Sequence, residues 1–468
     1  MLRAESFSTV IGDVTVYAAT DSGPQWVTGR DVVVEQGRIT AIRAAGGSGT
    51  AGVWPYVDGS GGHLIPGFVN THTHLQQSIL RGAGEGLPLL EWLHCVGEFT
   101  VAATPEQTYL AALAGGLELL RSGVTTVVEH MWPNPSDAVH QAALRALHEL
   151  GIRVVFGRGV ADRADASRRW GMDPRLLQAL PETFAHIDEL DERLGHGPAN
   201  EAARANPANA PARNGSPRIT TALAVPNPRC LTPEGMAAVR EYATRTGKTI
   251  SIHLLETGTD EDMCRLHAAT SAVDYLDRGG LLGERTLAVH CVRLDEYGRA
   301  LFAERGVAVS YNPLSNMRLG SGVAPIPDML AAGIAVGLGV DGAASNDTQD
   351  MLLALRMGAY LQRVTHQRAD LLDFHDMMRM ATRGAARALG EPGARDGVAV
   401  GDRADLSLIR FDRDFACLPA RDPGAILLTT ASPRVVDTVW VDGEAVIRDG
   451  RSTRTDEADL IARLSALA

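Results

Sequence analysis

Short apolar runs alternate with amphipathic segments along the middle of the chain. The apolar runs lie at residues 64–70, 125–131, 152–160, 218–225, 249–255, 286–292, 306–312 and 334–341. Segments with apolar residues at helical spacing separate several of these runs, at residues 105–123, 136–151, 232–247 and 325–333. Buried parallel strands have continuous apolar runs, and their crossover helices are amphipathic. Eight such units in succession predict an α/β fold, a (β/α)8 barrel of the TIM type.

An open, doubly wound sheet is the alternative arrangement of the same elements. The turn after the first apolar run lacks the GxGxxG pattern, so nothing in the sequence favours a dinucleotide-binding fold. Residues 196–217 interrupt the alternation with a stretch rich in Ala, Pro, Asn and Gly that has no apolar periodicity. We expect this stretch to be a long inserted loop or a disordered insertion.

Both ends of the chain have the alternating pattern of short β-strands. The pattern occupies residues 13–20 and 26–47 at one end, and residues 401–412 and 433–451 at the other. Each end has too few strands to be stable alone. We therefore predict a small β-sandwich domain built from both termini. Its N-terminal part is residues 1–62, its C-terminal part is residues 396–468, and the barrel is residues 63–395.

The composition of the 468 residues is that of an ordinary globular protein, with 45% hydrophobic and 21% charged residues. The formal net charge of −12 argues against nucleic acid or an anionic membrane as a partner. Five scattered cysteines fit free thiols in a reducing compartment better than a disulfide framework. We see neither a signal peptide nor a run of the ~20 apolar residues that a membrane helix needs. The expected protein is soluble and cytoplasmic.

Histidines and carboxylates follow several of the predicted barrel strands. His72 and His74 end the first run, and residues two apart on a strand face the same side. His253 and His290 lie in the fifth and sixth runs, and Asp341 ends the eighth. Barrel enzymes carry their sites at these carboxyl ends. Three imidazoles and one carboxylate suit zinc or ferrous iron, with a position left for water.

Each of these residues also has an ordinary structural explanation when taken alone. His253 alone is more often a core histidine, Asp341 a turn residue, and Glu256, which follows His253 in HLLE, a solvated carboxylate. Their joint occurrence at strand ends favours a metal site. The other strand ends contribute Glu129, His130, Arg158, Asn227 and Asn312.

With these residues assembled, the chain resembles the amidohydrolase superfamily, in particular its branch of heterocycle deaminases and s-triazine chlorohydrolases. The supporting stretches include PGFVNTHTHLQQSILRG, SGVTTVVEH, SIHLLET, AVHCVRLDE and GLGVDGAASND, and they span most of residues 60–410. The resemblance implies one divalent metal, zinc or ferrous iron, held by His72, His74, His253 and Asp341. It also implies catalytic roles for Glu256, His290 and Asp341, and a homo-oligomeric assembly.

The implied chemistry favours a deaminase that acts on a small N-heterocyclic substrate. Glu256 can carry a proton from water to a ring nitrogen, and His290 can stabilise the developing oxyanion. Asp341 can protonate departing ammonia, which is a step that chloride does not need; some chlorohydrolases of this branch have Thr in its place. The alternatives are a hydrolase that removes chloride or an alkylamine from a triazine-like ring, a cyclic amide hydrolase, and a non-catalytic metal-binding barrel.

Departures from the family pattern bear on the substrate. Adenosine-type deaminases of this branch carry a His where AVPNPRCLT has Pro226, which argues against thioadenosine and adenosylhomocysteine. Where 8-oxoguanine deaminases tend to have Cys, this chain has Asn312. A modified purine, a pterin or another amino-substituted N-heterocycle fits best. The candidate substrate-binding residues are Gln77, Glu91, Trp92, Asn227 and Asn312.

Overall fold

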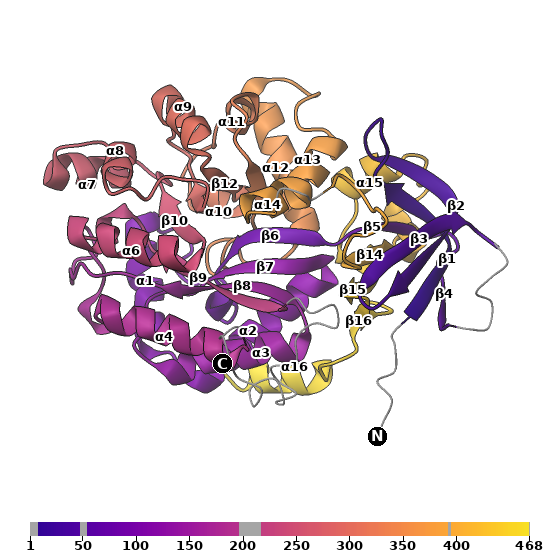
Figure 1. The fold of residues 1–468 in the computed structure, drawn as a ribbon, viewed down its shortest axis with the longest axis horizontal. Coiled ribbons are helices and arrows are strands. Elements are labelled where there is room, and N and C mark those ends of the chain that lie inside the picture. The colour runs from indigo at the N-terminus through magenta and orange to yellow at the C-terminus, as the bar shows by residue number, and fades with distance from the viewer. Residues whose placement is uncertain (1–7, 47–53, 196–216, 392–394, 468) are drawn as a thin grey trace.

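A computed structural model describes residues 8–46, 54–195, 217–391 and 395–467 of the chain. These residues form two sheets and the helices around them (Figure 1). The predicted insertion at 196–217 lies outside the described residues except for Pro217.

The first sheet has eight strands, all parallel, whose order in space follows their order in the chain. The strands are β6 (Phe68–Thr73), β7 (Val124–His130), β8 (Arg153–Gly159), β9 (Ile219–Val225), β10 (Ile250–Leu254), β11 (Thr286–His290), β12 (Ala308–Tyr311) and β13 (Val336–Leu338). After β13, the amide of Asp341 donates to the carbonyl of His72 at 2.9 Å and so joins the last strand to the first. The sheet is a nearly closed barrel, which confirms the predicted (β/α)8 fold.

Helices follow the barrel strands and cover the outside of the barrel (Figure 1). They are α1 (Leu89–Ala102), α2 (Pro105–Arg121), α3 (Asp137–Leu150), α4 (Leu180–Arg193), α6 (Pro233–Thr246), α7 (Thr259–Ala268), α8 (Ala272–Arg278), α9 (Glu296–Arg305), α10 (Pro313–Arg318), α11 (Ile326–Ala331), α12 (Met351–His366), α13 (Phe374–Ala381) and α14 (Arg383–Ala388). The local sequence sets several helix ends. Thr104 and Gln107 form a capping box at the start of α2, while Gly151 and Gly247 end α3 and α6 with φ of 72° and 75°.

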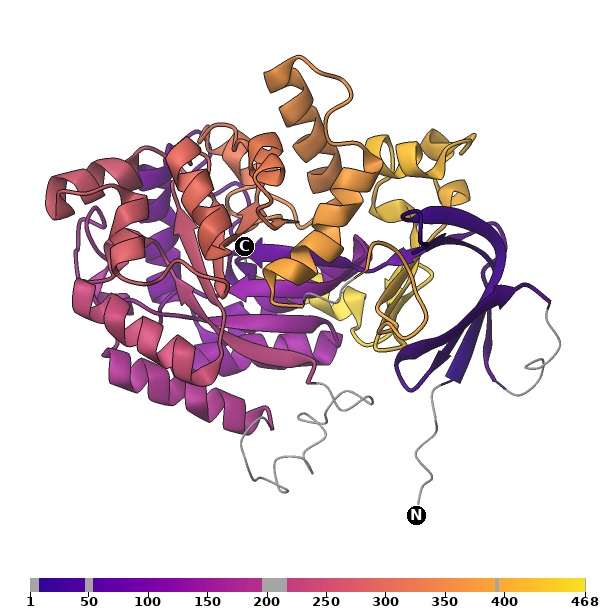
Figure 2. The same ribbon diagram turned by 45° about the horizontal axis from the view of Figure 1, so that its top comes forward.

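The second sheet is built from both termini, as predicted. Its hydrogen-bonded path is β17-β16-β15-β14-β5-β1-β2-β3, with β4 beside β1. The strands are β1 (Ser8–Ala18), β2 (Gln25–Glu35), β3 (Arg38–Ala44), β4 (Tyr56–Asp58), β5 (His63–Pro66), β14 (Leu406–Ile409), β15 (Val436–Val441), β16 (Glu444–Arg448) and β17 (Arg451–Ser452). Figure 2 shows how strongly its long N-terminal strands bend. Two more helices, α15 (Pro423–Thr429) and α16 (Glu457–Ser465), belong to the C-terminal part of the chain.

The strand β5 lies in this terminal sheet, although the predicted domain division assigns its residues to the barrel. It pairs with β1 on one side and with β14 on the other. It is therefore the strand that joins the N-terminal strands to the C-terminal ones, and the barrel starts at Phe68. In other respects the division into domains stays a prediction.

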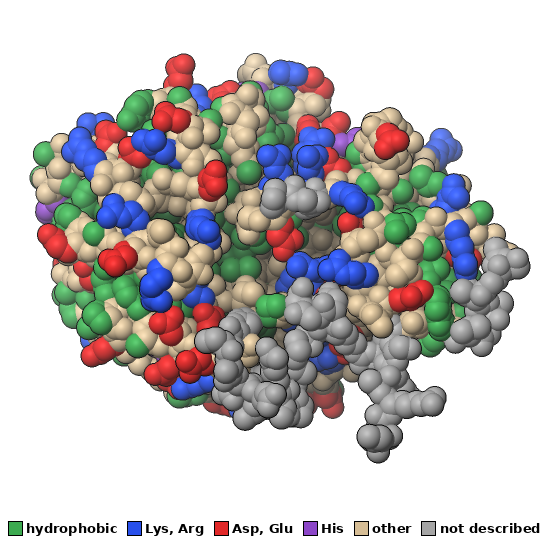
Figure 3. Space-filling model, viewed as in Figure 1, with side chains coloured by type: hydrophobic (Ala, Val, Ile, Leu, Met, Phe, Trp, Pro, Cys, Tyr) green, Lys and Arg blue, Asp and Glu red, His purple; other side chains and the backbone are tan. Residues whose placement is uncertain are grey.

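The terminal sheet packs against the amino-terminal ends of barrel strands. Arg153, the first residue of β8, forms ion pairs with Asp405 and Asp442 of the terminal sheet's loops. The carboxyl ends of the barrel strands therefore lie at the other end of the barrel, away from the terminal sheet (Figure 1). Acidic and basic side chains are interspersed over the face in Figure 3. Among the helices of the described residues, none has the length and apolarity to cross a membrane.

Candidate metal and catalytic site

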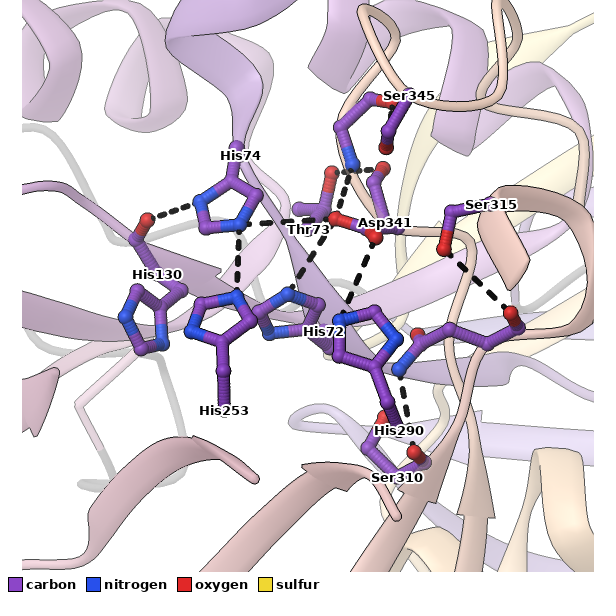
Figure 4. Close-up of polar contacts among 12 residues, drawn as sticks. His72, Thr73, His74, His130, His253, His290, Ser310, Ser315, Asp341 and Ser345 are labelled. Carbon is purple, nitrogen blue, oxygen red and sulfur yellow. Dashed lines mark hydrogen bonds and ion pairs between the residues drawn. The ribbon is translucent and has the colours of Figure 1, made fainter. Parts of the chain in front are cut away.

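The carboxyl ends of the barrel strands bring the predicted ligands and catalytic residues into one cluster (Figure 4). His72 and His74 come from the end of β6, His253 from β10, and Asp341 from the segment after β13. His72, His74 and Asp341 are less than 5% exposed. Figure 4 shows His72, His74 and His290 directed toward the Asp341 carboxylate, and His253 beside His74.

The spacing of the donor atoms suits a tetrahedral ion. Nε2 of His74 lies 3.1 Å from Nε2 of His253, and Oδ1 of Asp341 lies 3.4 Å from Nε2 of His72 and 3.5 Å from Nε2 of His74. Ligand atoms ~2.0–2.1 Å from a tetrahedral zinc are about 3.4 Å apart. Neither ring nitrogen of His72 has a hydrogen-bond partner within the described part of the chain. A buried imidazole without such a partner is expected where a metal is its partner.

Hydrogen bonds from the surrounding backbone orient these ligands. Nδ1 of His74 donates to the carbonyl oxygen of His130 at 2.6 Å, so its Nε2 carries the lone pair that faces the cluster. The amide of Gly342 donates to Oδ1 of Asp341 at 2.7 Å, and Thr73 donates to the carbonyl oxygen of Asp341. Two of the four predicted ligands, His74 and Asp341, are thus oriented by hydrogen bonds within the protein.

His130, at the end of β7, also lies in the cluster, although the predicted ligand set leaves it out. Ligand atoms of His72, His130 and His253 lie within 4.8 Å of one another, as do those of His72, His290 and Asp341. Nδ1 of His130 is 3.1 Å from Oγ of Ser251, whereas its Nε2 has no partner among the described residues. The signal for His130 was its place at a strand end, which it shares with the predicted ligands.

Glu256 and His290 lie beside Asp341. Nε2 of His290 is 3.6 Å from Oε2 of Glu256 and 3.7 Å from Oδ2 of Asp341. Asn316 donates from Nδ2 to Nδ1 of His290 at 3.1 Å, which leaves the ring proton of a neutral His290 on Nε2, facing the two carboxylates. Ser321 donates to Oε1 of Glu256 at 3.1 Å. The predicted site residues did not include Asn316 and Ser321. Asn316 contacts His290 and Ser321 contacts Glu256, and the sequence gives no sign of these contacts.

The backbone turns sharply at the positions that carry these groups. Leu255, His290 and Asp341 have φ of 52°, 72° and 68°. Residues other than glycine rarely adopt this left-handed conformation, and such strain concentrates at functional sites. Each of the three turns ends or follows a strand and directs its residue or the next one toward the cluster.

Burial sets the protonation states of the cluster. Burial, followed by the nearby His72, lowers the pKa of His74 to about 3, and burial also lowers the pKa of His72 and of His253. The imidazoles are therefore neutral, which is the form that binds metals. Burial raises the pKa of Glu256. Burial also acts to raise the pKa of Asp341, but the nearby His72 ring outweighs burial, and that pKa lies well below its usual range.

A cavity opens from the cluster and contains two of the five predicted substrate-binding residues. Trp92 and Asn227 line it, together with Trp132, Leu319 and two arginines, Arg168 and Arg229. The indole of Trp92 donates to the carbonyl oxygen of Ala344 at 3.0 Å.

The other three predicted substrate-binding residues lie outside the cavity lining. Gln77 is buried behind His74, next to Gly342. Asn312 is buried and donates to the carbonyl oxygen of Ser310. Glu91 is exposed on α1, because neighbouring residues of a helix point about 100° apart and Trp92 takes the inward direction.

Comparisons with known proteins show the family to which the chain belongs. The model of the amidohydrolase family matches residues 63–446, which is most of the chain. The chain belongs to the amidohydrolase family. A 5-methylthioadenosine/S-adenosylhomocysteine deaminase of Desulforudis audaxviator is 33% identical over 440 residues, which cover 94% of each chain. An 8-oxoguanine deaminase of Pseudomonas aeruginosa is 34% identical over 442 residues, or 93% of this chain and 94% of the relative.

Among solved structures, an atrazine chlorohydrolase of Arthrobacter aurescens TC1 in complex with zinc aligns with a TM-score of 0.87. It is 25% identical in sequence, and the alignment covers 98% of this chain and 99% of that one. Members of the amidohydrolase family with near-complete coverage of this chain thus include deaminases and a chlorohydrolase. The barrel and the terminal sheet of this chain are common to that fold.

Proposed function

We propose that this protein is a metal-dependent aminohydrolase that deaminates an amino-substituted N-heteroaromatic ring, such as a modified purine or a pterin, and releases ammonia. The observation that carries the proposal is the approach of the Glu256 and Asp341 carboxylates to Nε2 of His290, with all three residues lining one cavity. A metal site with a purely structural role needs neither a free carboxylate nor an imidazole beside its ligands. The deaminase relatives support the same reaction class.

The residues that would hold the metal are His72, His74, His253 and Asp341. Three neutral imidazoles and a carboxylate are a donor set typical of zinc, and the atrazine chlorohydrolase contains zinc. When bound, a divalent metal lowers the pKa of a coordinated water toward ~7. Ferrous iron accepts the same donors, so metal analysis decides between the two ions.

The side chains of the site can carry the two protons that deamination needs. Glu256 takes one proton from water and delivers it to a ring nitrogen, which makes the neighbouring carbon electrophilic toward the remaining hydroxyl. The Nε2 proton of His290 stabilises negative charge on the added oxygen. Asp341 then takes the proton of the added hydroxyl and passes it to the amino group, so that ammonia leaves and a ring carbonyl forms.

The structural likeness to the atrazine chlorohydrolase favours a second candidate, hydrolytic removal of chloride from a triazine-like ring. Chloride leaves without a proton, so this reaction needs Glu256 but not proton transfer by Asp341. Assays for ammonia and for chloride on the same enzyme preparation separate the two reactions. We further propose a cytoplasmic location, on the scattered cysteines that fit a reducing compartment, and a homo-oligomer, on the family resemblance alone; light scattering tests the assembly.

Ammonia release from a panel of 8-oxoguanine, 5′-methylthioadenosine, pterin and adenine, with chloride release from atrazine, tests the proposal. Glu256→Gln should keep its metal and its fold and lose a factor of about 10²–10⁴ or more in turnover, because an amide cannot carry the proton. Glu91→Gln is the matched control, since Glu91 is exposed and outside the cavity lining, and it should retain wild-type rates. Wild-type turnover by Glu256→Gln on every accepted substrate would refute the mechanism.

A further inference from the structure

A buried arginine in the cavity lining has a terminal nitrogen that donates to no residue that the structure describes. Arg229 lies in the short 3-10 helix η4 (Pro228–Cys230) after β9, is 3% exposed, and lines the cavity. We propose that Arg229 recognises a hydrogen-bond acceptor on the substrate, specifically an exocyclic oxo group of the ring. This inference rests on the proposed function and narrows its substrate class.

Two of the three guanidinium nitrogens of Arg229 donate hydrogen bonds to other residues of the protein. Nε donates to Oδ1 of Asp260 at 2.8 Å, and Nη1 donates to the carbonyl oxygen of Arg169 at 2.8 Å. Nη2 makes no hydrogen bond to any residue that the structure describes. Because the guanidinium is planar and its other nitrogens are held, the N–H groups of Nη2 have a fixed direction. Binding of a substrate therefore does not have to pay the entropy cost of ordering this side chain.

Asp260 holds the arginine and removes its net charge. Oδ1 of Asp260 accepts from Arg229, and Oδ2 accepts from the backbone amide of Leu255 at 2.9 Å, so this carboxylate is fixed at both oxygens. The ion pair is nearly fully buried. A neutralised guanidinium still presents a strong N–H donor, and it suits an uncharged carbonyl oxygen better than a carboxylate or phosphate, which would bring an uncompensated charge into a buried site.

The other arginine of the cavity lining differs from Arg229 in this respect. Arg168 donates from Nη1 to the carbonyl oxygens of Leu93 and His94, and from Nη2 to Glu98 and Asp173. Both of its terminal nitrogens are engaged within the protein. Arg229 is thus the lining arginine, within the described residues, that has a terminal nitrogen to offer.

A neighbouring side chain adds a second donor to the same wall. Asn227, two residues before Arg229, also lines the cavity; its Oδ1 accepts from Sγ of Cys230, and its Nδ2 donates to no residue that the structure describes. Trp92, Trp132 and Leu319 supply apolar contact elsewhere in the lining, as a flat ring requires. Donors on one wall and proton-transfer groups at the metal end together fit a neutral ring that carries both an amino group and an oxo group.

Matched pairs of rings test the proposal, because each pair differs by one oxo group. The pairs are adenine with 8-oxoadenine and 2-aminopurine with guanine, and kcat/KM for ammonia release is measured for each. A hydrogen bond to a charged group is typically worth ~1.5–3 kcal/mol, so the wild-type enzyme should prefer the oxo member of at least one pair by about 10- to 100-fold. In Arg229→Met the ratio of the two kcat/KM values should fall to about threefold or less, chiefly because KM for the oxo member rises.

Two further variants separate recognition from a general defect. Arg229→Lys keeps a donor without the planar fork and should retain part of the preference. Arg163→Met is the control, because Arg163 donates to the carbonyl oxygen of Leu231 in the same loop yet lies outside the cavity lining. It should leave the preference unchanged. A wild-type enzyme without preference in either pair, or an Arg229→Met enzyme that loses activity equally on both members, would overturn the inference.

Calorimetric titration of the same four rings into the metal-loaded wild-type protein and into Arg229→Lys measures binding directly. For each pair it gives the ratio of the affinity for the oxo member to the affinity for the other member, and this readout does not depend on a rate of ammonia release. If the wild-type protein releases ammonia from no ring, the proposed function fails. The binding ratio still decides the role of Arg229. A ratio near one in the wild-type protein refutes that role, even if the protein deaminates another compound.

Discussion

Replacing Arg153 should destabilise the protein by several kcal/mol, because this arginine joins the barrel to the terminal sheet through a buried ion cluster. Nε of Arg153 lies 3.0 Å from Oδ2 of Asp405, and its Nη2 also contacts Asp442. The side chains of Arg153 and Asp442 are 8% and 0% exposed. Burial acts to raise the pKa of Asp405, but the charge of Arg153 outweighs it and holds that pKa below its usual value.

The expected loss in free energy of unfolding follows from the polar contacts that each carboxylate keeps in Arg153→Met. Asp442 keeps an ion pair with Arg218 at 3.2 Å, whereas Asp405 keeps the hydrogen bond from the amide of Asp442. Removal of one partner from a buried ion pair costs ~3–5 kcal/mol, because a charge is left buried. Arg463→Met is the comparison, since Arg463 pairs with Glu106 where the side chains are 36% and 57% exposed. Surface pairs of this kind contribute ~0–1 kcal/mol.

The loss of stability in Arg153→Met should also depend on pH. In the wild-type protein the lowered pKa of Asp405 contributes stability above the unfolded pKa, and this stability is lost as pH falls through the folded pKa. In the variant, burial without the arginine raises the folded pKa instead, so the variant loses stability as pH rises through the unfolded value. The difference between the two proteins should therefore be smaller at about pH 5 than at about pH 7.

Urea unfolding followed by tryptophan fluorescence measures these differences, since Trp440 lies buried in β15 and Trp132 in the barrel. Arg153→Met combined with Asp405→Asn should recover a large part of the loss, because the amide oxygen can still accept from Asp442 and no buried charge remains. A loss no larger than that of Arg463→Met, or one independent of pH, would show that the cluster does not hold the two sheets together.

Three further predictions concern the site. Chelation should abolish ammonia release and lower the thermal unfolding midpoint, because an ion present at ~1,000 times its Kd stabilises the folded state by ~4 kcal/mol. Re-addition of zinc should restore both the activity and the midpoint. An unchanged midpoint with full activity would contradict a metal site. Trp92→Phe should raise KM several-fold with a smaller effect on kcat, because it leaves the Ala344 carbonyl without its donor at a cost of ~1 kcal/mol; steady-state kinetics would disprove this if kcat alone fell. Asn316→Leu should lower kcat about tenfold without loss of metal, because Asn316 fixes the His290 ring proton on Nε2, and a wild-type kcat would argue against that role.

The fold was predictable because each element has a local signature. The helix predicted over residues 105–123 is α2, and those predicted over 136–151 and 232–247 are α3 and α6, each with its boundary within two residues. The metal-site candidates were also predictable in part, since parallel strands in a barrel all end on one side. For that reason residues separated by more than 250 positions in the chain, such as His72 and Asp341, meet in the structure.

The cavity lining was less predictable, because it depends on the direction of each side chain. Gln77 and Asn312 are buried near the site, yet neither side chain lines the cavity. Gln77 packs against Gly342, and Asn312 donates to the carbonyl oxygen of Ser310. Arg229 shows the opposite case, since its role follows from Asp260 and from a backbone carbonyl 60 residues earlier in the chain. No local pattern in PNPRCLT distinguishes such an arginine from a surface residue.

Stability and chemistry are divided between the two ends of the barrel. The start of β8 bears Arg153 and the ion cluster with the terminal sheet, whereas the ends of β6, β7, β10 and β11 bear the imidazoles of the site. Strained backbone at Leu255, His290 and Asp341 costs free energy, about 1–3 kcal/mol for each residue in such a conformation. The buried contacts at the other end of the barrel help to offset that cost without entering the cavity. Arg153→Met should therefore weaken folding while the folded fraction keeps the metal content and the kcat of the wild-type protein.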